Sequence, residues 1–199
     1  MVKLSLKLTM TPTKKNILLT GLPGIGKTTL IRKLSEELKG LHPVGFYTEE
    51  IREGGIRKGF GLISLDDRKG LLSHTEIKSP YRVGKYRVDV KGFEVFLDSI
   101  AFFVPETNLI VIDEIGKMEC LSVKFRKFIQ EVFNSGKRVI ATIAFKGNGF
   151  IEEIKKRDDV KLFVMTKENR DILLLEILSL FPLESSPHRR LDPLNPTIL

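Results

Sequence analysis

The chain has 199 residues, of which 42% are hydrophobic and 29% charged, and its formal net charge is +8. This composition is that of a globular protein and excludes a disordered chain, while the length suits one domain. Apolar stretches are far shorter than the roughly 18–20 residues of a membrane span, and a single cysteine excludes an internal disulfide. We therefore expect a cytoplasmic protein that is not bound to a membrane.

Apolar runs alternate with segments of helical periodicity along most of the chain. Strands or hairpins are expected at 16–20, 44–49, 60–65, 70–74, 86–90, 109–112, 138–143 and 160–165, and helices at 28–38, 93–103, 122–133, 150–156 and 169–180. Strands that are interleaved with helices favour a mainly parallel sheet with helices on both faces. The predicted fold class is therefore α/β.

A glycine-rich segment joins the first predicted strand to the first predicted helix. It reads Gly21, Leu22, Pro23, Gly24, Ile25, Gly26, Lys27, Thr28, followed by Thr29, and it matches the pattern G-x-x-x-x-G-K-[ST] of a phosphate-binding P-loop. In such a loop the backbone N–H groups and the helix N-terminus surround a β-phosphate, and the lysine reaches the β- and γ-phosphates. We predict that Lys27 is catalytic and that the Thr28 hydroxyl is a Mg²⁺ ligand.

Two carboxylates follow the apolar run 109–112. Asp113 and Glu114 would lie beside the P-loop if both strands end at the same edge of the sheet. Asp113 is then a second metal-binding residue, and Glu114 is placed to orient and deprotonate a water. The alternative is that the pair caps a following helix.

Four segments together resemble the thermophile-type nucleoside-triphosphatase family of P-loop proteins, which includes the human cancer-related nucleoside-triphosphatase. They are the P-loop, RVGKYRVD at 82–89, DEIGKME at 113–119 and TKENR at 166–170. The resemblance spans about residues 16–181 and implies a RecA-like sheet and Mg²⁺-dependent hydrolysis of several nucleoside triphosphates to diphosphates. It also implies that Gly116 lies at the nucleotide site with Asp113 and Glu114.

Four arginines are candidates for the cation that neutralises the γ-phosphate during transfer, as an arginine finger does. They are Arg52, Arg57, Arg82 and Arg170, and Arg82 is preferred because it belongs to the RVGKY segment. Asn169 and Arg170 are candidates for contact with the nucleotide base, although Asn169 is also a simple helix-start residue. Cys120 is expected to be a small core residue.

Two other functions stay open at this point. A small nucleotide or metabolite kinase has a similar P-loop, and the glycine- and arginine-rich segment 52–68 would serve as its lid. A nucleic-acid-stimulated ATPase is the other alternative. A nucleic-acid partner is not favoured, however, because half of the excess positive charge lies in residues 1–15 and no basic block follows. The sequence does not indicate an oligomeric state.

The two ends differ from the body of the chain. Residues 1–14 alternate leucine with polar residues, which predicts either an edge strand or a loose leader. Residues 184–199 are rich in proline and lack periodicity, which predicts a loose tail. The P-loop domain is therefore expected to span residues 15–183.

Overall fold

The computed structural model describes residues 14–147 and 149–181. The strands are β1 (Asn16–Gly21), β2 (Pro43–Glu53), β3 (Ile56–Ser64), β4 (Lys69–His74), β5 (Arg82–Val83), β6 (Tyr86–Val88), β7 (Leu109–Ile115), β8 (Arg138–Ile143) and β9 (Val160–Met165). The helices are α1 (Lys27–Glu37), α2 (Val90–Asp98), α3 (Val123–Asn134), α4 (Phe150–Lys155) and α5 (Arg170–Leu178), with 3₁₀ turns η1 (Lys39–Leu41) and η2 (Glu119–Leu121). Except for Lys14, the predicted leader and tail lie outside the described residues.

All the described strands belong to one sheet, in the order β5-β6-β4-β3-β2-β7-β8-β1-β9. From β2 to β9 the neighbouring strands are parallel, and β8 separates β1 from β7. From β2 to β5 they are antiparallel. The sheet is therefore a parallel half with an antiparallel extension, and the predicted α/β P-loop fold of RecA-like type is confirmed.

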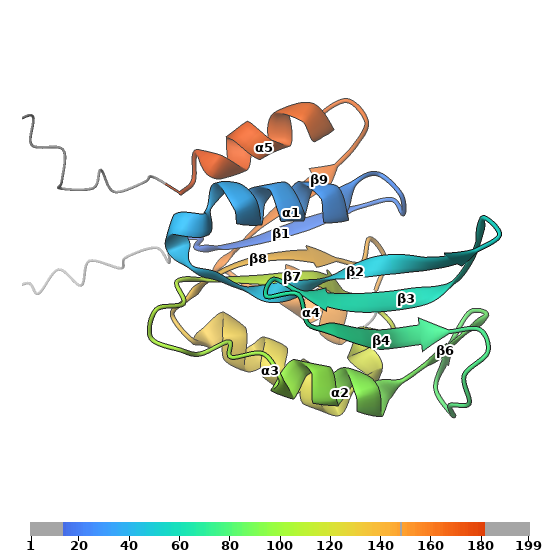
Figure 1. Cartoon of the computed structure of the whole chain (residues 1–199). Coiled ribbons are helices and arrows are strands. Elements are labelled where there is room, and N and C mark those ends of the chain that lie inside the picture. Colours follow the sequence, from blue (N-terminus) through green and yellow to red (C-terminus); the bar gives the residue numbers. More distant parts are fainter. Residues whose placement is uncertain (1–13, 148, 182–199) are drawn as a thin grey trace, which may run out of the picture.

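Helices cover both faces of the sheet, as predicted. In Figure 1, α1 and α5 lie on one face, while α2, α3 and α4 lie on the other. A hydrophobic core lies on each face of the sheet. Because side chains alternate along a strand, Ile17 and Leu19 of β1 pack under α1, and Leu18 packs in the core on the opposite face. Both faces of the parallel strands are buried, which explains their continuous apolar sequences.

Several segments differ from the sequence prediction: β5 was not expected, and β2 and β7 extend beyond their predicted ends to Glu53 and Ile115. Helix α2 was expected at 93–103, but it begins at Val90 because the Asp89 carboxylate accepts a hydrogen bond from the Gly92 N–H at 2.9 Å, and it ends at Asp98. The candidate kinase lid at 52–68 is the end of a β-hairpin that is continuous with the sheet, since Arg52 in β2 pairs with Arg57 in β3. Among the described residues, no helix is both long and apolar enough to cross a bilayer.

Candidate active site

The glycine-rich segment connects the buried strand β1 directly to helix α1. Gly26 precedes the helix with φ +108°, a left-handed conformation that a residue with a side chain adopts only at a cost. No side chain caps the start of α1, so its first N–H groups are available to an anion together with the helix dipole. The Lys27 ammonium lies back over the loop and donates to the Gly21 carbonyl at 3.2 Å. These features form an anion-binding cradle.

The Asp113 carboxylate lies at the end of β7, beside this cradle, and is only 1% exposed. The Thr28 hydroxyl of α1 donates to Asp113 Oδ2 at 2.7 Å. On the two strands that flank β7, the Thr48 hydroxyl donates to the same oxygen at 3.3 Å and the Thr142 hydroxyl donates to Oδ1. Three threonines from three elements thus fix this carboxylate.

Sequence reasoning missed Thr48 and Thr142. Phe46 and Ala141 both pair with Ile112 across the parallel strands, so each threonine lies one or two residues beyond the same register position. The signal available in the sequence was a hydroxyl residue near the end of a buried strand. That signal becomes useful only when the strand order is known, because β2 and β8 are far apart in the sequence.

The oxygen atoms of Thr28 and Asp113 fit a magnesium ion. Mg²⁺ is bound in proteins by one or two side-chain oxygens, with water and substrate phosphates completing the shell. The described residues contain no cluster of three or more His, Cys, Asp and Glu side chains that could hold a metal. One carboxylate and one hydroxyl at 2.7 Å beside an anion cradle suit Mg²⁺ carried with a triphosphate.

Glu114 is the next residue along β7 and is mostly buried. Burial raises the pKa of its carboxyl above the ordinary value, the nearby Lys27 ammonium lowers it in part, and the Asp113 carboxylate adds to the increase. A raised pKa makes a carboxylate a stronger base as long as it is ionised. The charges of Lys27 and Asp113 thus both act on the Glu114 carboxyl, while its role as the base stays a prediction.

Gly116 and Glu119 complete this part of the site. A Cβ atom on Gly116 would lie 2.6 Å from Glu119 Oε2, so a larger residue there would require the Glu119 carboxyl to move, whereas its 3.5 Å distance from Glu114 Oε1 is an ordinary contact. Glu119 begins η2 and is 5% exposed. Burial, together with the charge of Glu114, raises the pKa of Glu119 to about 8. The sequence analysis assigned no role to this second glutamate.

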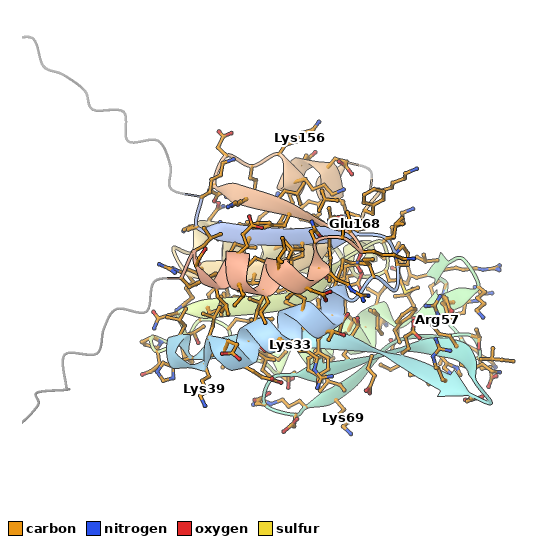
Figure 2. The ribbon with its side chains drawn as sticks, turned by 90° about the horizontal axis from the view of Figure 1, so that it is seen from above. Lys33, Lys39, Arg57, Lys69, Lys156 and Glu168 are labelled. Atoms are coloured by element: carbon orange, nitrogen blue, oxygen red, sulfur yellow. The ribbon has the colours of Figure 1, made fainter. Side chains whose placement is uncertain are left out.

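The candidate arginines make their contacts elsewhere. Arg52 and Arg57 both pair with Glu50, and Figure 2 shows Arg57 on the antiparallel strands, away from α5. Arg82 is exposed and its Nε donates to the Gly84 carbonyl within the β5–β6 hairpin at 2.6 Å. Arg170 lies 3.5 Å from Asp171. In this structure none of these described contacts joins an arginine to the phosphate loop.

Asn169 closes the turn between β9 and α5. Its side-chain oxygen accepts from the Thr166 N–H at 2.8 Å, and its amide nitrogen donates to the Val164 carbonyl at 2.9 Å. These bonds give Asn169 a structural role at the start of the helix. Within the loop itself, Leu22, Pro23 and Gly24 are exposed, as is Thr29 in the first turn of α1.

Comparisons with known proteins agree with this geometry. A model of the family described as NTPase matches residues 16–178. The nucleoside-triphosphatase THEP1 of Thermotoga maritima is 52% identical over 164 residues, which cover 82% of this chain and 93% of the relative. The human cancer-related nucleoside-triphosphatase is 42% identical over 181 residues, covering 83% and 95% of the two chains.

Two solved structures resemble the whole described domain. The crystal structure of THEP1 from the hyperthermophile Aquifex aeolicus superposes with a TM-score of 0.76 at 37% identity, covering 84% of this chain and 99% of that one. The solution structure of a human cancer-related nucleoside triphosphatase gives a TM-score of 0.70 at 41% identity, with coverage of 84% and 97%. The likeness therefore extends over nearly the full length of both structures.

Proposed function

Because the chain belongs to the NTPase family, we propose that it hydrolyses nucleoside triphosphates, including ATP and GTP, to the diphosphate and phosphate with Mg²⁺. The observation that carries the proposal is the hydrogen bond from the Thr28 hydroxyl to Asp113 Oδ2 at 2.7 Å. Glu114 follows Asp113 in the sequence, and the N-terminus of α1 beside them has no side-chain cap. A metal-binding pair, an anion cradle and a carboxylate base are thereby collected at one edge of the sheet.

In this proposal each residue has a distinct task. The loop N–H groups of residues 21–28 bind the β-phosphate, and the Lys27 ammonium leaves the Gly21 carbonyl to contact the β- and γ-phosphates. Thr28 and Asp113 would hold Mg²⁺, which supplies charge neutralisation for the phosphates when bound. Glu114 accepts a proton from the attacking water, and its raised pKa suits that task.

Two further assignments complete the proposal. Arg82 is the cation that approaches the γ-phosphate during transfer, which requires its guanidinium to leave the Gly84 carbonyl. Base tolerance is broad, because the contacts described above all go to phosphates and the metal. Asn169 and Arg170 lie in the β9–α5 turn and at the start of α5, where they contact the base loosely if at all.

Product analysis tests the proposed function. Each of the four common triphosphates is incubated with Mg²⁺ and the full chain, with Glu114→Gln as the control, and diphosphate and inorganic phosphate are measured. We expect equal amounts of both products, with ATP and GTP hydrolysed within about tenfold of each other, a difference of about 1.4 kcal/mol. Phosphate transfer to an added acceptor in place of hydrolysis would contradict the proposal and favour a kinase.

A further inference from the structure

A cleft of about 650 Å³ is lined in part by residues of α3 and α4. These helices cover the face of the sheet opposite α1 in Figure 1. The volume of the cleft is within the range of small-molecule sites, about 300–1,000 Å³. Partly buried apolar side chains, among them Val83, Leu121 and Phe150, form part of its wall and also pack against the core. No residue of the phosphate loop lines it, so the cleft is separate from the candidate triphosphate cradle.

The cleft brings together segments that are far apart in the sequence. Val83 belongs to the RVGKY segment, and Lys117 belongs to the DEIGKME segment, three residues after Glu114. Lys146 follows β8, and Arg126 lies on α3. Two of the four segments that carry the family resemblance therefore meet here.

Three cations and no acidic residue are among the described residues that line this cleft. Lys117, Arg126 and Lys146 form no ion pair with a described residue, and the Arg126 guanidinium donates to the Cys120 carbonyl. One acidic group close to the lining, Glu152, is already paired. Glu152 accepts from the Gly147 N–H and pairs with Lys155 at 2.9 Å.

Cys120, which lines the cleft, and its sequence neighbour Glu119 add little negative charge at neutral pH. Burial raises the pKa of the Cys120 thiol to about 12, and the pKa of Glu119 is raised to about 8. Both groups are thus mainly protonated at pH 7. The cleft therefore combines a positive rim with an apolar wall.

We propose that this cleft binds a phosphorylated small molecule with an aromatic or apolar part, independently of the triphosphate at the phosphate loop. The phosphate would contact Lys117, Lys146 and Arg126, because charge-assisted bonds to a phosphate satisfy these cations. The apolar part would pack against Phe150 and Val83. Three cations around a bounded cleft fit one phosphate group better than a nucleic acid, which needs a longer positive track.

Methyl NMR of the full chain tests this proposal, with Mg-ADP present at saturation to fill the phosphate loop. Phenyl phosphate is the probe, and inorganic phosphate and phenol are its two halves tested alone. We expect phenyl phosphate to shift the methyl signals of Val83, Leu121 and Ile151 saturably, and to bind at least about tenfold more tightly than either half. The Ile25 methyl in the phosphate loop should not move.

A pair of double variants identifies the cations. Lys117→Ala with Lys146→Ala should weaken phenyl phosphate binding at least about tenfold, since each change removes a charge-assisted contact. Lys127→Ala with Lys156→Ala removes two exposed lysines outside the cleft, one of them at the edge of the molecule in Figure 2, and should leave binding unchanged. All four lysine side chains are exposed, so folding is preserved.

Three results would overturn the proposal. The first is a shift of Ile25 alone, or of no methyl at all. The second is equal weakening in the two double variants. The third is displacement of phenyl phosphate by a single-stranded oligonucleotide of about 12 residues that binds far more tightly through Lys117 and Lys146, which would make the cleft a nucleic-acid groove. If Mg-ADP fails to shift Ile25, the proposed nucleotide site is wrong, while the cleft can still be tested.

Discussion

The two halves of the sheet hold their charged side chains in different ways. In the parallel half, Asp113 is almost fully buried and receives hydrogen bonds from three threonines. In the antiparallel extension, Arg52 and Arg57 share the exposed Glu50. Exposed ion pairs contribute about 0–1 kcal/mol each, whereas a buried carboxylate requires its partners. We therefore expect the parallel half to tolerate substitution poorly and the extension to tolerate it well, with Arg82 as the exception.

The largest effect is expected from Lys27→Ala. The lysine is the side-chain cation that the loop places next to the phosphates, so its loss should abolish most turnover and weaken triphosphate binding as well. Turnover and a binding titration on the same sample measure the two effects, and circular dichroism confirms the fold. Near-normal hydrolysis by the folded variant would remove the phosphate loop from the mechanism.

Glu114→Gln separates water activation from binding. The amide keeps the size of the side chain but cannot accept the proton, so single-turnover hydrolysis should fall about 10²–10⁴-fold with nucleotide affinity nearly intact. In the parent protein the rate should fall on acidification at a pH above the ordinary glutamate range, because burial raises the pKa of this base. A wild-type rate in the variant would make another residue the base.

Asp113→Asn is the matched comparison for Glu114→Gln. Because Asp113 is assigned to the metal, its loss should weaken nucleotide binding and turnover together, and added Mg²⁺ should restore part of the rate. The rate is measured across a Mg²⁺ titration for both variants. Rescue of Glu114→Gln but not of Asp113→Asn would reverse the two assignments.

Most of the parallel half could be predicted from the sequence. Its strands are continuous apolar runs, and its candidate site residues lie in short contiguous motifs. The predicted ranges 138–143 and 160–165 coincide with β8 and β9. The partners of Asp113 could not be predicted in this way. Thr48 and Thr142 reach it only through the strand order, which depends on packing between segments that are distant in the chain.

The antiparallel extension was harder to predict, because part of its sequence suits two different structures. Its strands were expected, but segment 52–68 also suited a kinase lid, since glycine and arginine residues are common in both. The structure places Arg52 and Arg57 opposite each other in the β2–β3 hairpin. The assignment of Glu114 and Arg82 to catalysis stays a prediction.

Arg82→Ala tests whether the extension contributes to catalysis. We expect kcat to fall at least about tenfold with little change in KM, because an arginine finger acts on the transition state. Arg57→Ala is the matched control, because Arg57 lies in β3 of the same antiparallel extension. Its turnover should stay within about threefold of the parent. Equal, small effects in both variants would mean that the extension has no catalytic cation at these positions.

A smaller effect is expected from Thr142→Val. Valine keeps the shape of the side chain but removes a hydrogen bond to Asp113, so the free energy of unfolding should fall by about 1–3 kcal/mol. The Mg²⁺ concentration needed for half-maximal rate should rise several-fold, because the carboxylate is no longer fixed on that side. Thr107→Val, at a buried threonine whose hydroxyl has no partner in the described structure, serves as the control. It should leave the Mg²⁺ requirement unchanged.

The last effect concerns Glu119 and appears only in the pH dependence of stability. The pKa of this carboxyl is about 8 in the folded protein, compared with an ordinary value of 4.5 that applies to the unfolded chain. Between these two pH values the folded state keeps a proton that the unfolded state has lost. The free energy of unfolding should therefore fall as the pH rises from about 5 to 8, by an amount on the order of a few kcal/mol.

Glu119→Gln removes this titration, so it should flatten the dependence of the free energy of unfolding on pH between 5 and 8. Compared with the parent at the same pH, the variant should therefore gain stability as the pH rises from 5 to 8. Urea unfolding at a series of pH values measures the difference, with Glu131→Gln, an exposed change on α3, as the control that should follow the parent. Parallel curves for the parent and Glu119→Gln would show that Glu119 is ionised in the folded protein. Because the charges of Glu114 and Glu119 act on each other, Glu114 would then share its surroundings with a second charge, and its own pKa would be higher still.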